Sequence, residues 1–202
     1  MFYCSSRCGF TVQADAGEFS VLGGLDLAKS TFSPELVGVV YSGVSKFTLG
    51  VDYDYSFTRK WGVEVGLFYQ SRGGKQTLGT RVGELGYHSL TVPIMVRYTL
   101  IPHYLSVGAG IYGSYGLGRV TLTEMEGSTV VDTQSAAYDV ARVSRSDFGL
   151  VWGVRGSYRV TQRIEVIGDI RYYYGLKNLR LSSSETLKST DLAVLVGARL
   201  AL

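Results

Sequence analysis

Hydrophobic and polar positions alternate with a period of two in one segment of the chain after another. The clearest case lies between positions 46 and 57, where large apolar side chains take every second position and polar residues or glycine take the others. The apolar set comprises Phe47, Leu49, Val51, Tyr53, Tyr55 and Phe57. A helix would scatter both sets around its circumference, so the pattern indicates a β-strand. This apolar face continues for about six positions, roughly the depth of a bilayer core for a tilted strand.

The same alternation recurs along the chain and predicts eight strands in all. They cover positions 19–26, 46–57, 61–70, 90–100, 105–112, 148–158, 164–174 and 192–202, of which the first is the shortest. The short connections lie near 58–60, 102–103 and 161–162, and the long ones cover 28–45, 73–88, 118–145 and 177–189. Short turns at one end and long loops at the other are typical of outer-membrane barrels. We therefore expect an all-β fold, an eight-stranded antiparallel up-and-down transmembrane β-barrel, with both termini in the periplasm.

A soluble β-sandwich also alternates and is the main alternative to a membrane barrel. The polar face of a sandwich meets water and carries many lysines and glutamates, whereas here it is mostly glycine, serine and threonine. Charged residues make up 18% of the chain, against roughly 25% in soluble domains. Aromatic residues gather near the strand ends, as interfacial girdles do. They are Phe57, Trp61, Tyr98 and Tyr158 on the turn side, and Tyr69, Phe148 and Tyr174 on the loop side.

Residues 1–16 differ from the barrel pattern and are interpreted as a leader or a truncated signal peptide, with the barrel over 17–202. Ala14-Asp15-Ala16 is a small-residue cleavage pattern, but no proper apolar core precedes it. Cys4 and Cys8 lie in this segment, and without a nearby histidine they make a poor zinc site. The sequence contains no run of about 18 apolar residues, so no transmembrane helix is predicted. The net charge of +3 is dispersed and does not suggest nucleic acid as a partner.

Charged residues of both signs fall on the inward face of the predicted barrel. Eight of them form the expected lumen charge network: Glu64, Arg97, Arg155, Arg159, Glu165, Asp169, Arg171 and Arg199. Asp26, Asp52 and Asp54 also point inward. Matching heights on antiparallel strands brings Glu64 close to Arg97, places Arg159 and Arg199 level with Glu165, and puts Arg155 and Asp169 slightly higher. Since an unpaired buried charge costs several kcal/mol, we expect a salt-bridged structural plug; an ion or substrate path is the alternative.

No catalytic, cofactor or metal site is predicted. His88 and Ser89 invite comparison with lipid-modifying hydrolases, but neighbours in a strand point to opposite faces and cannot pair directly. His103 falls in a short turn. The inward glycines, among them Gly108 and Gly153, would make room for arginine and tyrosine. The segment 118–145 is either a β-ribbon that continues the barrel above the membrane or a mobile surface loop, and it is the best place for an external contact.

Four segments resemble the outer-membrane β-barrel domain family that includes PorT-like proteins. They are YSFTRKWGVEVGLFYQSRGGKQ, YHSLTVPIMVRYTL, SDFGLVWGVRGSYRV and IRYYYGLKNL, and the resemblance covers about 18–202. The chain departs from the family at Thr91, where an acidic residue is common, and at Leu202, where an aromatic residue is typical. The resemblance implies a part in secretion or gliding machinery without catalysis, and it carries over no active site.

Together, these patterns predict a non-enzymatic integral barrel of the bacterial outer membrane, used as an envelope scaffold or as a component of a secretion or surface-assembly system. A small stand-alone channel or ligand-binding barrel is the second hypothesis, and a lipid-modifying enzyme centred on His88 the third. The expected partners are outer-membrane lipid, the barrel-insertion machinery and periplasmic or outer-membrane secretion components. No cofactor is expected.

Overall fold

The computed structural model describes residues 17–33, 39–78, 81–126, 129–138, 144–179 and 186–201, and every element in these ranges is a β-strand. The strands are β1 (Glu18–Ser33), β2 (Val39–Ser42), β3 (Val44–Ser56), β4 (Trp61–Leu78), β5 (Arg81–Ile101), β6 (Leu105–Glu126), β7 (Thr129–Ala136), β8 (Ser146–Arg159), β9 (Ile164–Gly175) and β10 (Thr186–Ala201). In this part of the chain, no helix is long and apolar enough to cross a membrane. The expected leader, with Cys4 and Cys8, lies outside the described residues.

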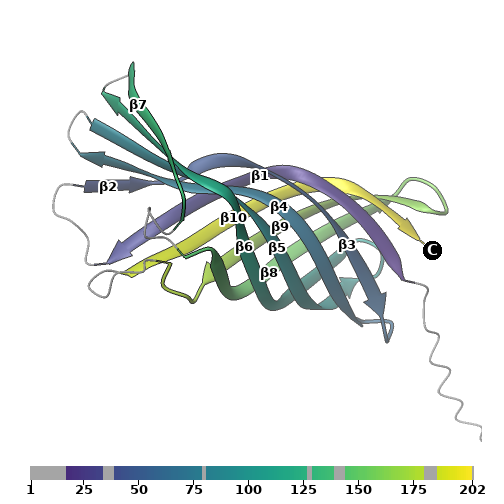
Figure 1. The fold of residues 1–202 in the computed structure, drawn as a ribbon. Helices are drawn as coiled ribbons and strands as arrows, with labels where there is room; N and C mark the ends of the chain where they lie inside the picture. Colours follow the sequence, from purple (N-terminus) through teal and green to yellow (C-terminus); the bar gives the residue numbers. More distant parts are fainter. Residues whose placement is uncertain are drawn as a thin grey trace, which may run out of the picture.

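Eight of the strands close into an antiparallel barrel. The order β3-β1-β10-β9-β8-β6-β5-β4 is closed by the β3–β4 pairing, so the predicted up-and-down barrel is confirmed (Figure 1). The two remaining strands are extensions: β2 pairs with the upper part of β4, and β7 pairs with β6. Glu18 pairs with both Ala201 and Asp54, so the first and last strands of the barrel begin and end beside the short turns.

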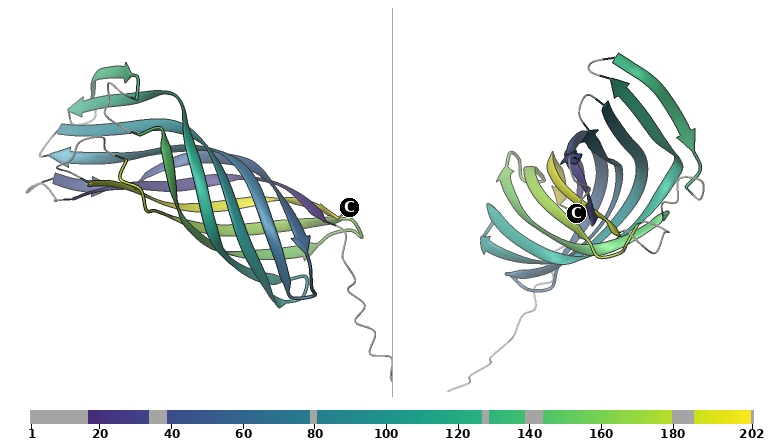
Figure 2. Two further views of the ribbon diagram at one scale, coloured as in Figure 1. Left: turned by 60° about the horizontal axis from the view of Figure 1, so that its bottom comes forward. Right: turned by 90° about the vertical axis from the view of Figure 1, so that its left-hand side faces the viewer.

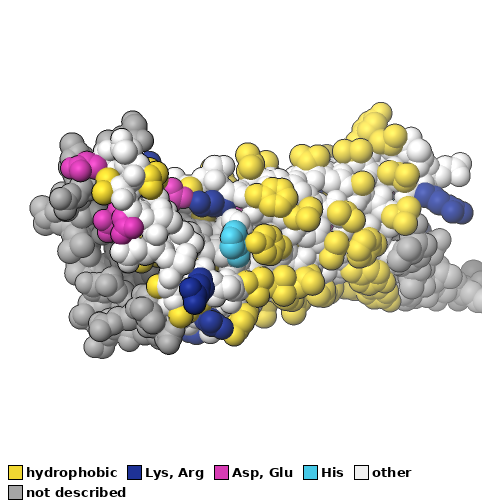
Figure 3. Space-filling view, turned by 45° about the horizontal axis from the view of Figure 1, so that its top comes forward, with side chains coloured by type: hydrophobic (Ala, Val, Ile, Leu, Met, Phe, Trp, Pro, Cys, Tyr) yellow, Lys and Arg dark blue, Asp and Glu magenta, His cyan; other side chains and the backbone are white. Residues whose placement is uncertain are grey.

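The outer wall carries the apolar face that the alternation predicts. Phe47, Leu49, Tyr53 and Tyr55 on β3 are each exposed by 42–52%, whereas Asp52 between them is 1% exposed. The other barrel strands repeat this pattern, and Figure 3 shows the resulting apolar band around one side of the barrel. Residues of both predicted girdles are exposed on this wall, including Trp61 at one boundary and Phe148 at the other. The wall is therefore suited to lipid and not to water.

Several strands extend well beyond their predicted ends. The first was expected over 19–26 and instead spans Glu18–Ser33, and the expected loop 73–88 is mostly a hairpin of β4 and β5, paired from Trp61↔Tyr98 to Leu78↔Arg81. Parts of the expected loops 28–45 and 177–189 are likewise strand. Above the apolar band both faces of a hairpin can meet water, so its strands lose the apolar-polar alternation although the backbone ladder continues.

The segment 118–145 was predicted to be either a β-ribbon or a mobile surface loop, and its described part contains the ribbon. Strand β6 continues to Glu126, and β7 returns along it from Thr129 to Ala136 with a register shift at Glu124/Met125. Figure 2 shows this ribbon bending away from the barrel axis together with the upper ends of β4 and β5. All but the last of the β7 residues are exposed. The ribbon thus gives the barrel a flared sheet at the end opposite the short turns.

Candidate functional site

The barrel interior is filled by a charged cluster near the short turns, which we call the lower cluster. It consists of Asp52, Asp54, Glu64, Arg97, Arg155, Asp169 and Arg171. These residues come from β3, β4, β5, β8 and β9, and each occupies an inward position of the alternating pattern. All seven side chains belong to residues that are at most 8% exposed. Such burial is tolerated only because the charges are paired.

Arg155 is the centre of the lower cluster. Its Nη2 atom lies 2.6 Å from Asp52 Oδ2, 2.6 Å from Asp169 Oδ2 and 3.0 Å from Glu64 Oε2. Its Nη1 atom donates to Asp54 Oδ2 at 2.6 Å. One guanidinium group on β8 therefore joins four carboxylates from three other strands, β3, β4 and β9. The planar fork of arginine suits this role because it offers five donors in a fixed geometry.

Two further arginines bind the same carboxylates. Arg171 Nη2 lies 2.9 Å from Asp52 Oδ2 and 2.8 Å from Asp169 Oδ2, and its Nη1 lies 3.0 Å from Glu64 Oε1. Arg97 donates from Nε to Glu64 and from Nη2 to Asp169 Oδ2, the latter at 2.9 Å. Each carboxylate of the cluster thus contacts at least two guanidinium groups, and hydrogen bonds between charged partners of this kind are stronger than neutral ones.

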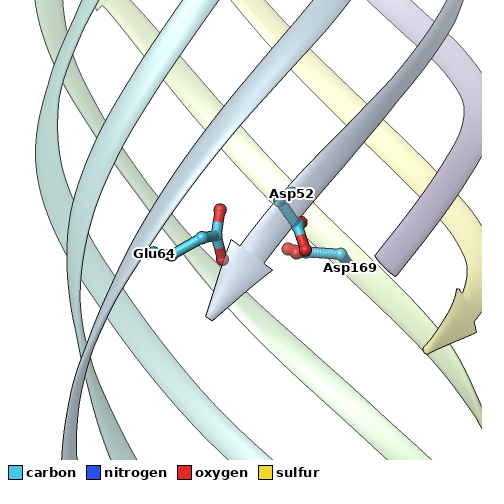
Figure 4. A group of neighbouring side chains, drawn as sticks. All are labelled: Asp52, Glu64 and Asp169. Atoms are coloured by element: carbon cyan, nitrogen blue, oxygen red, sulfur yellow. The ribbon is translucent and has the colours of Figure 1, made fainter. Parts of the chain in front are cut away.

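Asp52, Glu64 and Asp169 bring three carboxylate oxygens within 4.8 Å of one another, a spacing that could hold a metal ion (Figure 4). The geometry around them does not fit a cation, however. Asp52 Oδ2, Glu64 Oε2 and Asp169 Oδ2 all lie within 3.0 Å of Arg155 Nη2, so a guanidinium nitrogen already occupies the space between these carboxylates. Arg171 and Arg97 bring two more positive charges against Asp169, one of these three carboxylates. The trio is best described as part of an ion-pair network.

A second group of ion pairs surrounds the rim near the short turns. Arg199 Nη1 lies 2.7 Å from Glu18 Oε2, its Nη2 lies 2.7 Å from Asp54 Oδ2, and a longer contact of 3.9 Å reaches Glu165. Arg159 donates to Glu165 at 2.9 Å, with about half of its side chain exposed. The structure therefore places all eight residues of the predicted network in ion pairs, and the Glu64–Arg97, Arg155–Asp169 and Arg159–Glu165 pairs follow the height matching.

A second charged cluster, the upper cluster, surrounds Arg72 at the other end of the interior and was not predicted from the sequence. Arg72 is 1% exposed, with Nε 3.1 Å from Asp191 Oδ2 and Nη1 3.3 Å from Asp147 Oδ2. Gln70 accepts a hydrogen bond from Arg72 at 2.9 Å and donates to Asp26 at 3.3 Å. The alternation along β4 could have revealed this cluster. It places Arg72 on the inward face, two positions after Gln70 and just before the segment that was expected to be a loop.

Apolar and aromatic side chains separate the two clusters. Phe68 lies between Glu64 and Gln70 on the inward face of β4, and the Arg171 guanidinium carbon lies 4.6 Å from the centre of its ring. Tyr173 follows Arg171 on β9 and packs edge-on against Tyr112. These residues are buried with Leu22, Met95, Val151, Ile167, Ala193 and Leu195 in one apolar core. The middle of the interior is therefore packed, as expected for eight strands.

Inward glycines allow the arginines to fit. A Cβ on Gly108 would lie 3.1 Å from Arg97 Cγ, and one on Gly153 would lie 2.6 Å from the Ile170 carbonyl oxygen and 3.3 Å from Arg171 Cγ. Any larger residue at these positions would push the strand or the arginine aside. This agrees with the sequence-based interpretation of the inward glycines.

The described residues line two cavities at opposite ends of the barrel. The larger, about 360 Å³, opens near the short turns and is lined by polar groups that include Ser56, Thr99, Ser157 and Arg199. The smaller, about 180 Å³, lies near the upper cluster and is lined in part by Lys46, Glu84 and Tyr87. Most of the charged groups that line these cavities already have ion-pair partners, among them Arg199 in the larger and Lys46 and Glu84 in the smaller.

The two histidines have separate surroundings. His88 is exposed on the outer wall, stacks on Tyr69 with ring centres 5.5 Å apart, and has Nδ1 2.9 Å from Ser71 Oγ. Ser89 is buried on the opposite face, so the direct His88–Ser89 pair is absent, as the alternation predicts. His103 has φ 64° in the β5–β6 turn, and its Nδ1 lies 3.1 Å from Arg159 Nη2. Among the described residues, no carboxylate forms an ion pair with His88.

Comparison with known proteins identifies the type of barrel. The model of a family described as "Outer membrane protein beta-barrel domain" matches residues 13–180. No curated protein matches the sequence. Solved structures that share the fold include the outer membrane protein OprG from Pseudomonas aeruginosa, with 15% identity, TM-score 0.57, and coverage of 93% of this chain and 96% of that one. The outer membrane protease OmpT from Escherichia coli is also similar, with 9% identity, TM-score 0.55, and coverage of 96% and 99%.

Proposed function

Because the chain belongs to the family of outer membrane protein β-barrel domains, we propose that it serves the bacterial outer membrane without catalysis, as an envelope scaffold or as a component of a secretion or surface-assembly system. The PorT-like subtype stays a prediction. A fold shared with OprG and OmpT does not choose between these roles, since one barrel architecture supports several functions.

The packed interior is the observation that carries this proposal. Arg155 and its four carboxylates join strands on different sides of the barrel, and Phe68 and Tyr173 fill the space above them. A packed and ion-paired middle of the interior suits a rigid scaffold better than a conduit. The parts left to act on other molecules are the two ends and the outer wall.

The two ends differ in a way that suits a connecting role. We place the short turns and both chain termini in the periplasm, and the flared sheet with the β6–β7 ribbon outside the cell. The ribbon offers exposed Val130 and Val131 beside Glu124 and Asp132. Periplasmic components and the barrel-insertion machinery would meet the turns, and external components would meet the ribbon.

A small ligand-binding barrel is the second candidate, and the 360 Å³ cavity favours it. That volume is within the range of small-molecule pockets. Its lining is largely ion-paired, however, and most known ligand pockets are more apolar. The lipid-modifying enzyme is weaker, because the Ser71–His88 contact has no carboxylate partner among the described residues to orient the imidazole.

A cross-linked pull-down of the tagged barrel from its own membrane, analysed by mass spectrometry, tests the proposal. Recovery of the same periplasmic or outer-membrane proteins in repeated experiments would support a component of a larger assembly. Recovery of lipid and insertion machinery alone, together with single-channel conductance in planar bilayers, would contradict the proposal and favour the small channel.

A further inference from the structure

Two of the short turns have the same hydrogen-bond geometry. In the β3–β4 turn, Thr58 Oγ1 accepts from the backbone N–H of Trp61 at 2.9 Å and of Lys60 at 3.3 Å. In the β8–β9 turn, Thr161 Oγ1 accepts from Ile164 at 3.0 Å and from Arg163 at 3.3 Å. A threonine hydroxyl that bonds the backbone two and three residues later fixes the local chain path. The two turns are therefore equivalent pieces of structure.

The shared geometry puts a cation at the same place in both turns. Lys60 and Arg163 each come directly before the first outward-facing residue of the next strand, Trp61 (46% exposed) or Ile164 (44% exposed). Both cationic residues are exposed. Each turn thus holds a positive charge at the lower edge of the apolar band.

Lys60 also lies against the aromatic girdle. Its Nζ atom is 6.0 Å from the centre of the Tyr98 ring, and Tyr98 packs on Trp61 with ring centres 4.8 Å apart. Trp and Tyr side chains of this kind mark the headgroup level of a bilayer. The ammonium group is therefore at the depth where lipid phosphates lie.

At the end of the barrel with the short turns, the positive charges of Lys60 and Arg163 are not balanced by a neighbouring carboxylate. The segments 57–61, 101–105 and 159–164 contain Arg59, Lys60, Arg159 and Arg163 but no Asp or Glu. The nearby carboxylates are used elsewhere: Glu18 and Asp54 by Arg199, and Glu165 by Arg159. Within the part of the chain that the structure describes, no carboxylate lies within ion-pair distance of Lys60 or Arg163.

We propose that Lys60 and Arg163 bind the phosphate groups of anionic phospholipids in the periplasmic leaflet, each site consisting of the cation and its outward-facing apolar or aromatic neighbour. The inference rests on the membrane placement in the proposed function. A lipid surface fits better than an acidic protein, because Ile101, Tyr104 and Val160 in the same turns are 51–59% exposed and would lie in the interfacial layer. A Lys or Arg at an anionic surface gives about a fivefold preference for anionic lipid.

Quenching of Trp61 fluorescence by brominated lipids tests the Lys60 site. The full-length barrel is refolded into phosphatidylcholine vesicles in a Trp152→Phe background, so that Trp61 is the one tryptophan left. Brominated phosphatidylglycerol and brominated phosphatidylcholine are then compared. We expect roughly fivefold preferential quenching by phosphatidylglycerol at low salt, declining as salt is raised. Lys60→Gln should remove the preference, and Arg163→Gln, which makes the same charge change at a distant turn, should keep it.

Three results would overturn the proposal. These are equal quenching by both lipids in the parent, a preference that survives Lys60→Gln, and full competition by soluble glycerol phosphate, which would indicate a site for free phosphate. Gel mobility of unboiled samples ensures that each variant is folded. Because the assay uses defined vesicles, a failed pull-down leaves its result unaffected, and the loss of lipid preference would leave the scaffold proposal in place.

Discussion

Arg155 and Asp169 face each other from neighbouring strands β8 and β9, and Arg155 Nη2 lies 2.6 Å from Asp169 Oδ2 with both side chains at most 1% exposed. The same guanidinium group contacts Asp52 and Asp54 on β3 and Glu64 on β4, strands that have no backbone pairing with β8. The interior charges therefore link parts of the wall that the β-ladder does not join.

Replacing Arg155 by Met should strongly destabilise the barrel. The substitution removes a shared partner of four buried carboxylates, and breaking such a pair costs about 3–5 kcal/mol. Arg159→Met removes a half-exposed arginine of the same network and should cost at most about 1 kcal/mol. Urea unfolding in lipid vesicles, followed by tryptophan fluorescence, measures both. Equal effects would show that burial does not determine the strength of these pairs.

Arg97→Leu and Arg199→Leu should both lower the unfolding temperature, and Arg97→Leu should lower it more. Arg97 has 6% of its side chain exposed and contacts Glu64 and Asp169, whereas Arg199 is nearer the rim with 12% exposed. Heating series on gels give the unfolding temperatures. The double variant Glu64→Leu with Arg97→Leu should be less destabilised than the sum of the single variants, since it leaves fewer unpaired charges. Unchanged stability in both single arginine variants would rule out a structural plug.

Arg72→Met should destabilise the barrel by roughly 3 kcal/mol, because Asp147 and Asp191 lose a buried partner. The neighbouring residue provides a matched control. Ser71 is on the outer face of the same strand, and Ser71→Ala should change the free energy of unfolding by no more than about 0.5 kcal/mol. Chemical unfolding of the two variants under the same conditions measures the difference. Similar values for both would show that the upper cluster contributes little.

Cysteine labelling of intact cells should distinguish the two ends of the barrel. In a background of Cys4→Ser and Cys8→Ser, Thr133→Cys on β7 should react with a membrane-impermeant maleimide. Gln162→Cys in the β8–β9 turn should react only after the outer membrane is permeabilised. Both positions are exposed, so burial does not confuse the comparison. The reverse pattern of labelling would show that the barrel has the opposite orientation and that the proposed lipid sites face the outer leaflet.

Ser71→Ala and His88→Ala should leave the lipid composition of the outer membrane unchanged. Their 2.9 Å contact resembles part of a hydrolase site but has no orienting carboxylate in the described structure. Mass spectrometry of lipid A and phospholipids from cells carrying each variant is the measurement. A shift in acylation that both variants share, in cells with a normal amount of folded barrel, would favour the lipid-modifying enzyme.

The barrel and its lower cluster could be predicted because both follow from a period of two within the membrane. Once one face must be apolar, every charged residue in a strand falls inward, and antiparallel pairing fixes its approximate height. This is how Glu64 was matched with Arg97. The central role of Arg155 was not predicted, because it depends on which side chains meet across the interior rather than along neighbouring strands.

The upper cluster and the flared sheet were missed for a different reason. Above the apolar band, water replaces lipid on the outer face, so the residues of β4 and β5 beyond Gln70 need not alternate. Arg72 consequently fell outside the predicted strand, just before the expected loop, although its register with Tyr87 continues the hairpin. Strand bounds predicted from hydropathy therefore mark the edge of the lipid-facing band. The backbone hydrogen bonds between the strands can continue beyond that edge.

The seam between β1 and β10 pairs Glu18 with Ala201 and Ser33 with Thr186. Neither strand can gain its full set of ladder hydrogen bonds until the ribosome has made nearly the whole chain, because its partner is encoded at the opposite end of the barrel sequence. Closing so long a loop is entropically costly and slow. The barrel therefore cannot close until nearly all of its sequence has been made, and until then β1 and β10 each have an unpaired edge that can bind another strand.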